Sequence, residues 1–307
     1  MASSLTSEFR VKGYKVVDSG SDKYAFDLVA AKGEEVVAVK VVEHIDRSVR
    51  RIADDLRKLG SSLDLAPLLV CHEGASSDSL STYRGIPSLS YDTFKRLIRG
   101  EEVPFIYFSR GGIYVKIRGE VIRSKRRERN MSLGELAYEL GVSRRMVYAY
   151  ETGRADATLE VASRLVRTFG EEVVETLSLK TIHEHFNSQQ ALLRRSCPTT
   201  RVRDPLLRGF LRVLEELGYL RYLLERAPFH IAAGKREEGH KLLIRKAGEG
   251  DELENRVTVD VARVCHSRAI LVTRRSEDAL MNSHVVRIPE SALKINELRR
   301  VFENVLD

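Results

Sequence analysis

The chain has 307 residues, of which 43% are hydrophobic and 31% are charged, with a formal net charge of +7 and a pI near 9.3. No apolar run approaches the roughly 18 residues needed to span a bilayer, and the first residues lack the apolar stretch of a signal peptide, so we expect a cytoplasmic protein without membrane contact. The three cysteines (Cys71, Cys197 and Cys265) are too widely spaced for a disulfide framework or a metal cage, and we expect neither a metal nor a cofactor.

The N-terminal segment, residues 1–104, predicts an α/β domain. Residues 25–31 (AFDLVAA) alternate in polarity, residues 36–42 (VVAVKVV) form a mostly apolar strand, and residues 66–70 (APLLV) form a short buried strand. Helical segments follow the second and the third of these strands. Strands separated by helices favour an α/β sandwich with a mixed sheet.

The next domain is expected at residues 105–180 and begins with a β-hairpin. Two apolar runs within residues 105–116 flank the pair Gly111-Gly112, which favours a tight turn. Seven basic and two acidic residues follow between Lys116 and Arg129. A basic cluster suits a polyanionic partner, because each neutralised phosphate releases condensed counterions.

Residues 119–170 predict four short helices that are separated by polar or glycine breaks. The first helix covers residues 119–128. Ser132 starts the second helix, where Glu135 completes a capping box, and Gly141 ends it because a left-handed conformation is easiest without a Cβ.

The third helix is expected at residues 144–152, with Ser143 as its cap and Gly153 after its end. A fourth helix covers about residues 158–169. Its inner face is expected to consist of Leu159, Ala162, Leu165, Val166 and Phe169.

The spacing of Ala137, Gly141 and Val147 predicts how the second and third helices meet. Two helices joined by a three- or four-residue turn must cross at a steep angle. Ala137 lets them approach, Gly141 makes the turn, and Val147 fills the angle between them. The positions that define this structure are Leu136, Ala137, Leu140, Gly141, Val142, Val147 and Tyr150.

This segment resembles the helix-turn-helix of the Cro and lambda-repressor family, including its Tyr-Glu-x-Gly ending at residues 150–153. The resemblance implies that the third helix enters the major groove of double-stranded DNA. Leu133 stands where family members often carry Gln, so base recognition must rely on the third helix. The expected DNA contacts are Ser143, Arg144, Arg145, Tyr148 and Ala149 on that helix, Arg154 beyond it, and Lys125, Arg126 and Arg127 before it.

The sequence leaves open what each of these basic residues does. Arg144 and Arg145 can each contact a guanine edge, which specifies sequence, or a phosphate, which only positions the protein. A solvated charged face is the alternative interpretation for Arg154 and for the basic residues 125–127.

The remaining chain consists of a predicted linker at residues 181–204 and a second domain at residues 205–307 that repeats the first. Gly13-Tyr14 corresponds to Gly218-Tyr219, Phe26 to Phe229, and Lys32 to Lys235. A duplication with so long a period indicates two similar domains and not a solenoid.

The order of elements in both copies resembles the restriction-endonuclease-like fold. That resemblance implies an Asp on one strand and a Glu-x-Lys on the next, which together hold magnesium. Asp27 and Lys40 occupy the first and last of these positions, but Ala38 stands in the middle, and His230 takes the Asp position in the second copy. We therefore interpret Asp27 and Lys40 as a remnant ion pair and expect no catalysis.

The whole arrangement resembles an archaeal family of helix-turn-helix transcriptional regulators. It implies an α/β plus all-α protein, in which a Cro-like domain of four to five helices lies between two degenerate nuclease-like domains. The expected function is sequence-specific binding of double-stranded DNA by a homodimer, which we expect to form through the sheet faces of the nuclease-like domains by analogy with resolvases. The sequence names no small-molecule effector.

Two other functions are compatible with the sequence. The first is a structure-specific or junction-binding nuclease, in which another carboxylate, such as Glu43, joins Asp27 and Lys40. The second is a coactivator or chromatin-associated protein whose Cro-like domain binds DNA without sequence preference or binds a protein.

Overall fold

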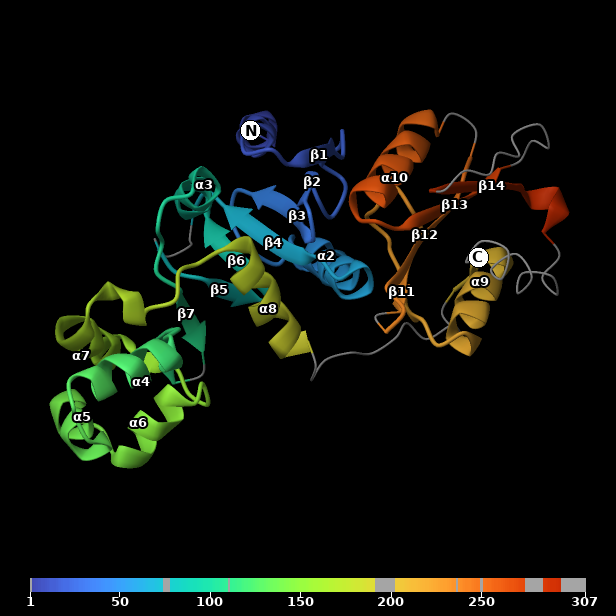
Figure 1. The fold of residues 1–307 in the computed structure, drawn as a ribbon. Helices are drawn as coiled ribbons and strands as arrows, with labels where there is room; N and C mark the ends of the chain where they lie inside the picture. Colours follow the sequence, from blue (N-terminus) through green and yellow to red (C-terminus); the bar gives the residue numbers. More distant parts are fainter. Residues whose placement is uncertain are drawn as a thin grey trace. The chain divides into compact units, whose positions relative to one another are not determined.

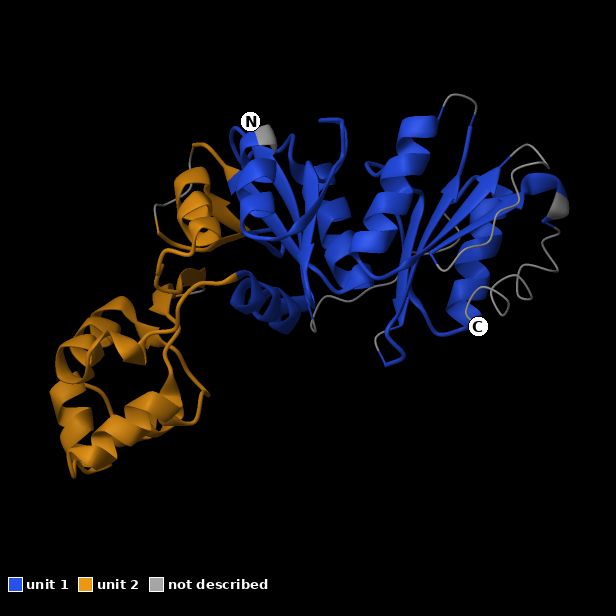
Figure 2. Cartoon of the chain, turned by 45° about the horizontal axis from the view of Figure 1, so that its top comes forward, with its two compact units in different colours: residues 1–70, 83–87, 179–307 blue, residues 71–82, 88–178 orange. Residues whose placement is uncertain are grey.

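The computed structural model describes residues 2–73, 78–109, 111–190, 202–235, 237–248, 251–273 and 284–293 (Figure 1). The chain divides into two compact units (Figure 2). Unit 1 consists of residues 1–70, 83–87 and 179–307, and unit 2 consists of residues 71–82 and 88–178. Within the described residues, no helix combines the length and the apolarity that crossing a membrane requires.

The N-terminal domain is a mixed α/β structure, as its strand pattern predicts. Its sheet has the strand order β1-β2-β3-β4-β6-β5. Its elements are α1 (Ala2–Val11), β1 (Lys15–Asp18), β2 (Leu28–Lys32), β3 (Glu35–Val42), α2 (Arg50–Leu63), β4 (Ala66–Cys71), β5 (Ser81–Tyr83), β6 (Ile86–Ser90) and α3 (Tyr91–Arg99).

The central hairpin of this domain explains why its strands are so apolar. β2 and β3 pair antiparallel, with Leu28 opposite Val39 and Lys32 opposite Glu35. Gly33 turns the chain between them at a φ of 60°. The central residues of both strands, from Leu28 to Ala31 and from Val36 to Lys40, are all buried, since the sheet is covered on both faces. Helix α1 and strands β1, β5 and β6 are additions to the predicted order of strand, strand, helix, strand and helix.

The C-terminal domain repeats this architecture. Its five-stranded sheet has the order β10-β11-β12-β13-β14, in which β10, β11 and β12 pair antiparallel, whereas β12, β13 and β14 pair parallel. The sheet is therefore mixed, as expected. Its elements are α9 (Pro205–Glu216), β10 (Leu220–Leu223), β11 (Ile231–Lys235), β12 (His240–Lys246), α10 (Glu252–Val264), β13 (Arg268–Thr273), β14 (Val285–Pro289) and η4 (Glu290–Ala292).

The prediction of a linker at residues 181–204 is wrong for its first ten residues. Residues 179–190 form helix α8 (Leu179–Gln190), and α8 packs on β3. Ile182 and Phe186 are fully buried there, because apolar residues recur at helical spacing within a mostly polar segment. Residues 191–201 of the predicted linker lie outside the described residues.

Within unit 1 the two copies pack against each other in a reciprocal way. Helix α2 of the first copy lies on β10 and β11 of the second, and helix α10 of the second lies on β1 and β2 of the first (Figure 1). Such an exchange is typical of a two-fold axis between related domains. The equivalent residues Phe26 and Phe229 meet across it as stacked rings, with centroids 6.5 Å apart.

One hydrophobic core is shared by both copies. Leu56 and Leu59 from α2, and Val257 and Val261 from α10, belong to a single cluster of buried residues together with the two phenylalanines. Gly234 permits the close approach of α2, because a Cβ at this position would lie 1.9 Å from the carbonyl oxygen of Ser62. The duplication is therefore a pair of domains with a common interior.

Unit 2 contains the predicted hairpin and the four predicted helices. β7 (Ile106–Ser109) and β8 (Gly112–Val115) pair antiparallel, and β8 also pairs with the short β9 (Ala157–Thr158). The helices are α4 (Gly119–Glu128), α5 (Leu133–Leu140), α6 (Arg144–Glu151) and α7 (Leu159–Phe169), followed by η1 (Glu171–Val173). The hairpin is thus joined by hydrogen bonds to the segment that enters α7.

The close approach at Gly234 makes a testable prediction. Gly234→Ala brings two backbones into a clash that only an opening of the α2–β11 contact can relieve, so we expect a loss of about 1–3 kcal/mol in unfolding free energy. The control is Gly134→Ala, where the new Cβ meets only the movable guanidinium of Arg144. Thermal unfolding of both variants measures the difference, and equal midpoints would contradict the packing described here.

Candidate nucleic-acid interface

The crossing of α5 and α6 is built from the three residues that the sequence singles out. Ala137 and Val147 are buried between the helices, and Gly141 adopts a left-handed φ of 67° where α5 ends. The Val142 N–H donates to the Ala137 carbonyl across this turn. Leu136, Leu140 and Tyr150 complete the buried face, so the predicted steric arrangement is confirmed.

Both helix starts carry the predicted caps. The Ser132 hydroxyl accepts from the Glu135 N–H, and the Glu135 carboxylate accepts from the Ser132 N–H. These hydrogen bonds lower the pKa of Glu135. The Ser143 hydroxyl accepts from the Met146 N–H at the start of α6. The caps fix the residue at which each helix begins.

The outer side of α6 presents the residues that we expect to contact DNA. Ser143, Arg144, Arg145 and Tyr148 are exposed, and Ala149 is half-buried among them. In the described structure no carboxylate pairs with Arg144 or Arg145. Both guanidinium groups are therefore available to an external anion or a base edge.

Arg126 is the clearest departure from the predicted contacts. Its guanidinium pairs with the Glu151 carboxylate through two nitrogens at 2.5 and 3.0 Å, and it donates to the Met131 carbonyl at 2.7 Å. The side chains of Arg126 and Glu151 are only 11% and 4% exposed. Hydrogen bonding to Glu151 raises the pKa of Arg126. This arginine ties α4 to the end of α6 and is not free to grip a phosphate.

The other predicted basic contacts differ among themselves. The Lys125 ammonium donates to the Phe169 carbonyl at the end of α7 and pairs with Glu172, so it is also largely committed within the fold. Arg127 is exposed on α4. Arg154 is exposed and lies over the Tyr148 ring, 5.8 Å from its centroid. Arg127 and Arg154 remain the better phosphate candidates.

Several features of this unit are invisible in the helical pattern. Gly119 packs against the end of α6, where a Cβ would lie 2.2 Å from the Tyr150 carbonyl oxygen. The Arg164 guanidinium caps α5 by donating to the Leu140 carbonyl. Tyr138 is 89% exposed on the outer side of α5. A signal for the Arg126–Glu151 pair does exist, because Glu151 belongs to the Tyr-Glu-x-Gly ending.

The prediction that Leu159 lies on the inner face of the fourth helix is wrong. It is 49% exposed, because it is the first residue of α7 and follows the cap residue Thr158. Ala162, Leu165 and Phe169 are buried as expected, and Val166 is half-buried.

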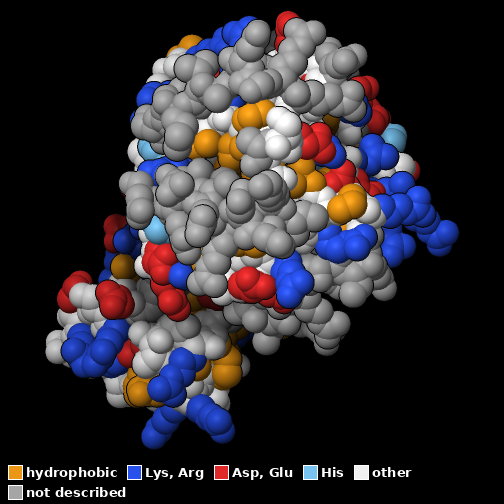
Figure 3. Space-filling view, turned by 90° about the vertical axis from the view of Figure 1, so that its right-hand side faces the viewer, with side chains coloured by type: hydrophobic (Ala, Val, Ile, Leu, Met, Phe, Trp, Pro, Cys, Tyr) orange, Lys and Arg blue, Asp and Glu red, His pale blue; other side chains and the backbone are white. Residues whose placement is uncertain are grey.

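The distribution of charge over the surface says less about DNA binding than the local geometry of α6 does. On the face drawn in Figure 3, basic and acidic side chains are interspersed. The excess of +7 is therefore not gathered into one patch on that face. The unpaired arginines at the start of α6 are more informative than the overall balance.

The nuclease-like positions form an internal hydrogen-bond network in each copy. Lys40 donates to Asp27 at 2.7 Å and to the Asp22 carbonyl at 2.8 Å, and the other Asp27 oxygen accepts from the Val41 N–H. The predicted ion pair of Asp27 with Lys40 is thus present. The buried Ala38 offers no second carboxylate.

His230 takes the place of Asp27 in the second copy. Its Nδ1 accepts from the Lys246 N–H, as Asp27 accepts from Val41. Burial lowers the pKa of His230, and the nearby Arg245 lowers it further, which favours the neutral ring that this hydrogen bond needs. Within the described ranges no group of three His, Cys, Asp or Glu side chains could hold a metal ion.

The Arg126–Glu151 pair makes a stability prediction. Glu151→Ala leaves a buried guanidinium without its carboxylate, and we expect it to lower the unfolding free energy by about 3–5 kcal/mol. The control is Glu160→Ala, which removes an exposed pair with Arg164 and should cost less than about 1 kcal/mol. Chemical denaturation measures both values. A loss at Glu151 no greater than at Glu160 would contradict a structural role for the pair.

Comparison with known proteins supports both parts of this architecture. Residues 1–104 match the PD-(D/E)XK superfamily domain, and residues 122–175 match a helix-turn-helix family. Over part of its length the chain is also 22% identical to the solved clp gene regulator ClgR of Corynebacterium glutamicum, with a TM-score of 0.16 and with 33% of this chain and 88% of that chain covered.

Archaeal relatives extend over most of the chain. A protein of Thermoplasma acidophilum named as an HTH-type transcriptional regulatory protein is 32% identical over 86% of this chain and 83% of its own length. One of Halobacterium salinarum with the same type of name is 31% identical over 87% of this chain and 84% of its own length. The chain therefore belongs to this archaeal family of HTH-type transcriptional regulatory proteins, in which a PD-(D/E)XK-like domain precedes a Cro-type helix-turn-helix.

Proposed function

We propose that the protein reads the sequence of double-stranded DNA through the outer side of α6. The observation that carries the proposal is the pair Arg144 and Arg145, exposed at the start of α6 and without a carboxylate partner in the described structure. A guanidinium matches the O6 and N7 acceptors of guanine in the major groove. Ser143 and Tyr148 beside them can donate hydrogen bonds to phosphates or bases.

The rigidity of the support favours sequence reading over a loose electrostatic contact. Gly134 leaves room for the Arg144 guanidinium, which lies against the start of α5. The caps and the buried Arg126–Glu151 pair hold α4, α5 and α6 in one arrangement. Side chains that are positioned before binding lose less conformational freedom when they contact DNA.

The nuclease-like domains are proposed to be non-catalytic. Asp27 already accepts from Lys40 and from the Val41 N–H, and one carboxylate cannot hold the metal ions that this type of hydrolysis requires. The homodimer that we expected through the sheet faces of these domains is not proposed, because the two copies of one chain already cover these faces with α2 and α10.

Double substitution of Arg144 and Arg145 by alanine tests the main proposal. On a duplex obtained by in vitro selection, we expect affinity to fall by at least about tenfold per lost guanine contact, whereas affinity for random duplex falls less. The control is Arg212→Ala with Arg256→Ala, which removes the same charge from exposed positions in the C-terminal domain. Equal losses on both duplexes would indicate phosphate contacts alone.

Arg127→Ala with Arg154→Ala should behave differently. If these side chains contact phosphates, affinity falls about equally on all sequences, and the slope of log affinity against log salt becomes shallower by about 1 for each residue. Titration of both duplexes at several salt concentrations measures this. A change of sequence preference in this variant would reassign Arg127 or Arg154 to base recognition.

The non-catalytic proposal is tested with magnesium or manganese and with duplex and branched DNA. We expect the DNA to stay intact after prolonged incubation. Cleavage that is abolished by Asp27→Ala would establish the nuclease alternative, provided that Asp27→Ala remains folded by circular dichroism. Cleavage that persists in Asp27→Ala would point to a contaminating enzyme.

A further inference from the structure

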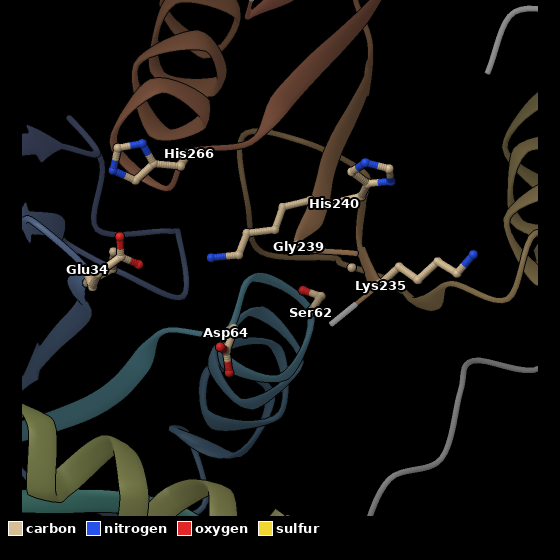
Figure 4. A pocket seen from close by; sticks show the side chains of 10 residues that line it. Glu34, Ser62, Asp64, Lys235, Gly239, His240 and His266 are labelled. Atoms are coloured by element: carbon tan, nitrogen blue, oxygen red, sulfur yellow. The ribbon is translucent and has the colours of Figure 1, made fainter. Parts of the chain in front are cut away.

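A pocket lies at the junction of the two copies, and the two copies contribute side chains of different charge to it. It has a volume of about 310 Å3 and is lined by both domains of unit 1. Glu34 and Asp64 come from the first copy, and His266 comes from the second (Figure 4). Lys241 of the second copy also lines the pocket. The acidic side chains thus belong to one copy and the basic side chains to the other.

The register of the two sheets shows that these residues occupy equivalent positions. Lys32 opposite Glu35 closes the hairpin of the first copy, as Lys235 opposite His240 closes that of the second. Counting one residue onward, Val36 is the equivalent of Lys241.

The ends of the long helices give the second equivalence. Asp64 follows α2 and His266 follows α10, and each adopts a φ of 50°. The N–H of the next residue donates back into its own helix in both cases, from Leu65 to Gly60 and from Ser267 to Ala262. Asp64 and His266 therefore occupy the same structural position, which carries an acidic side chain in the first copy and a basic side chain in the second.

This divergence disfavours pairing of like copies. Two first copies joined in the same way would bring two sets of Glu34 and Asp64 into one pocket, with Lys32 in the place of Lys235 but without Lys241 and His266. Two second copies would bring two sets of Lys241 and His266 together without Glu34 and Asp64, and the nearby Glu238 already pairs with Lys235 and His240. Like charges brought together at an interface penalise the wrong pairing, whereas opposite charges favour the right one.

Polar contacts outside the pocket show the same asymmetry. The buried Asp55 on α2 accepts from the N–H groups of Glu225 and Arg226. Its equivalent on α10, counted from Asp64 and His266, is Val257, which cannot accept. A pair of two second copies would leave those two N–H groups without this charged acceptor.

Glu254 on α10 provides the converse case. It accepts from the Tyr24 hydroxyl at 3.0 Å and pairs with Lys23 at 3.3 Å. Its equivalent on α2 is Ile52. A pair of two first copies would therefore lack the carboxylate that Tyr24 and Lys23 contact.

We propose that this interface selects a first copy against a second copy and closes within a single chain, so that the protein is a monomer in solution. Each chain then carries one helix-turn-helix for a complete pair of nuclease-like domains. Where the proposed function also holds, one chain binds one asymmetric DNA site. The pairing itself does not depend on DNA binding.

Charge exchange in the full chain tests the selectivity. Glu34→Lys alone and Lys241→Glu alone each place like charges in the pocket, and we expect each to lower the unfolding midpoint by roughly 2–4 °C. The variant with both changes restores opposite charges and should return to within about 1 °C of the parent. The control is Glu184→Lys on the exposed side of α8, which should shift the midpoint little and should not be rescued by Lys241→Glu.

Light scattering of the full chain without DNA tests closure within one chain. We expect the mass of one chain, 34.8 kDa, over a wide range of concentrations. Two differently tagged chains expressed together should then purify separately. A mass of two chains, whether from like pairing or from exchange of domains between chains, would overturn the proposal, and so would purely additive effects of Glu34→Lys and Lys241→Glu.

Discussion

The packing of α5 against α6 is the constraint on which the DNA-binding surface depends. Val147 fills the angle, Gly141 turns the chain, and Ala137 leaves space between the helices. Because this inner side is fully packed, the opposite side of α6 has to face outward, and Arg144 and Arg145 lie on it. The Arg126–Glu151 pair adds a charge-assisted link between α4 and α6. The side chains proposed to read DNA are thus positioned by residues that never contact it.

The two α/β domains of unit 1 are stabilised in a different way. Helix α2 of the first domain packs on the sheet of the second, and helix α10 of the second packs on the sheet of the first. Their apolar surface is thereby buried in one shared core. The positions where related enzymes need carboxylates are occupied by Ala38 and His230, whose burial and hydrogen bonding favour packing. Divergence at Asp64 and His266 separates the roles of the two copies. The two copies within one chain thus serve as packing partners for each other.

Much of this structure is readable from local patterns in the sequence. Ser132, Glu135 and Gly141 mark the ends of α5 because capping depends on neighbours within one turn. The duplication appears through Phe26 and Phe229, although their stacking depends on three-dimensional packing. The pairing of Arg126 with Glu151 is not predictable from the sequence, because an arginine in a basic run looks solvated until its distant partner is known. Helix α8 resembles a linker in composition, because its polar residues outnumber the apolar ones, of which Leu179, Ile182 and Phe186 are buried.

In vitro selection from random duplexes with the full chain tests the central claim most directly. Sequence reading by α6 predicts that a short motif is enriched and that the Arg144→Ala, Arg145→Ala double variant no longer enriches it. A selected pool as diverse as the starting pool, bound by the parent protein with full affinity, would contradict the account.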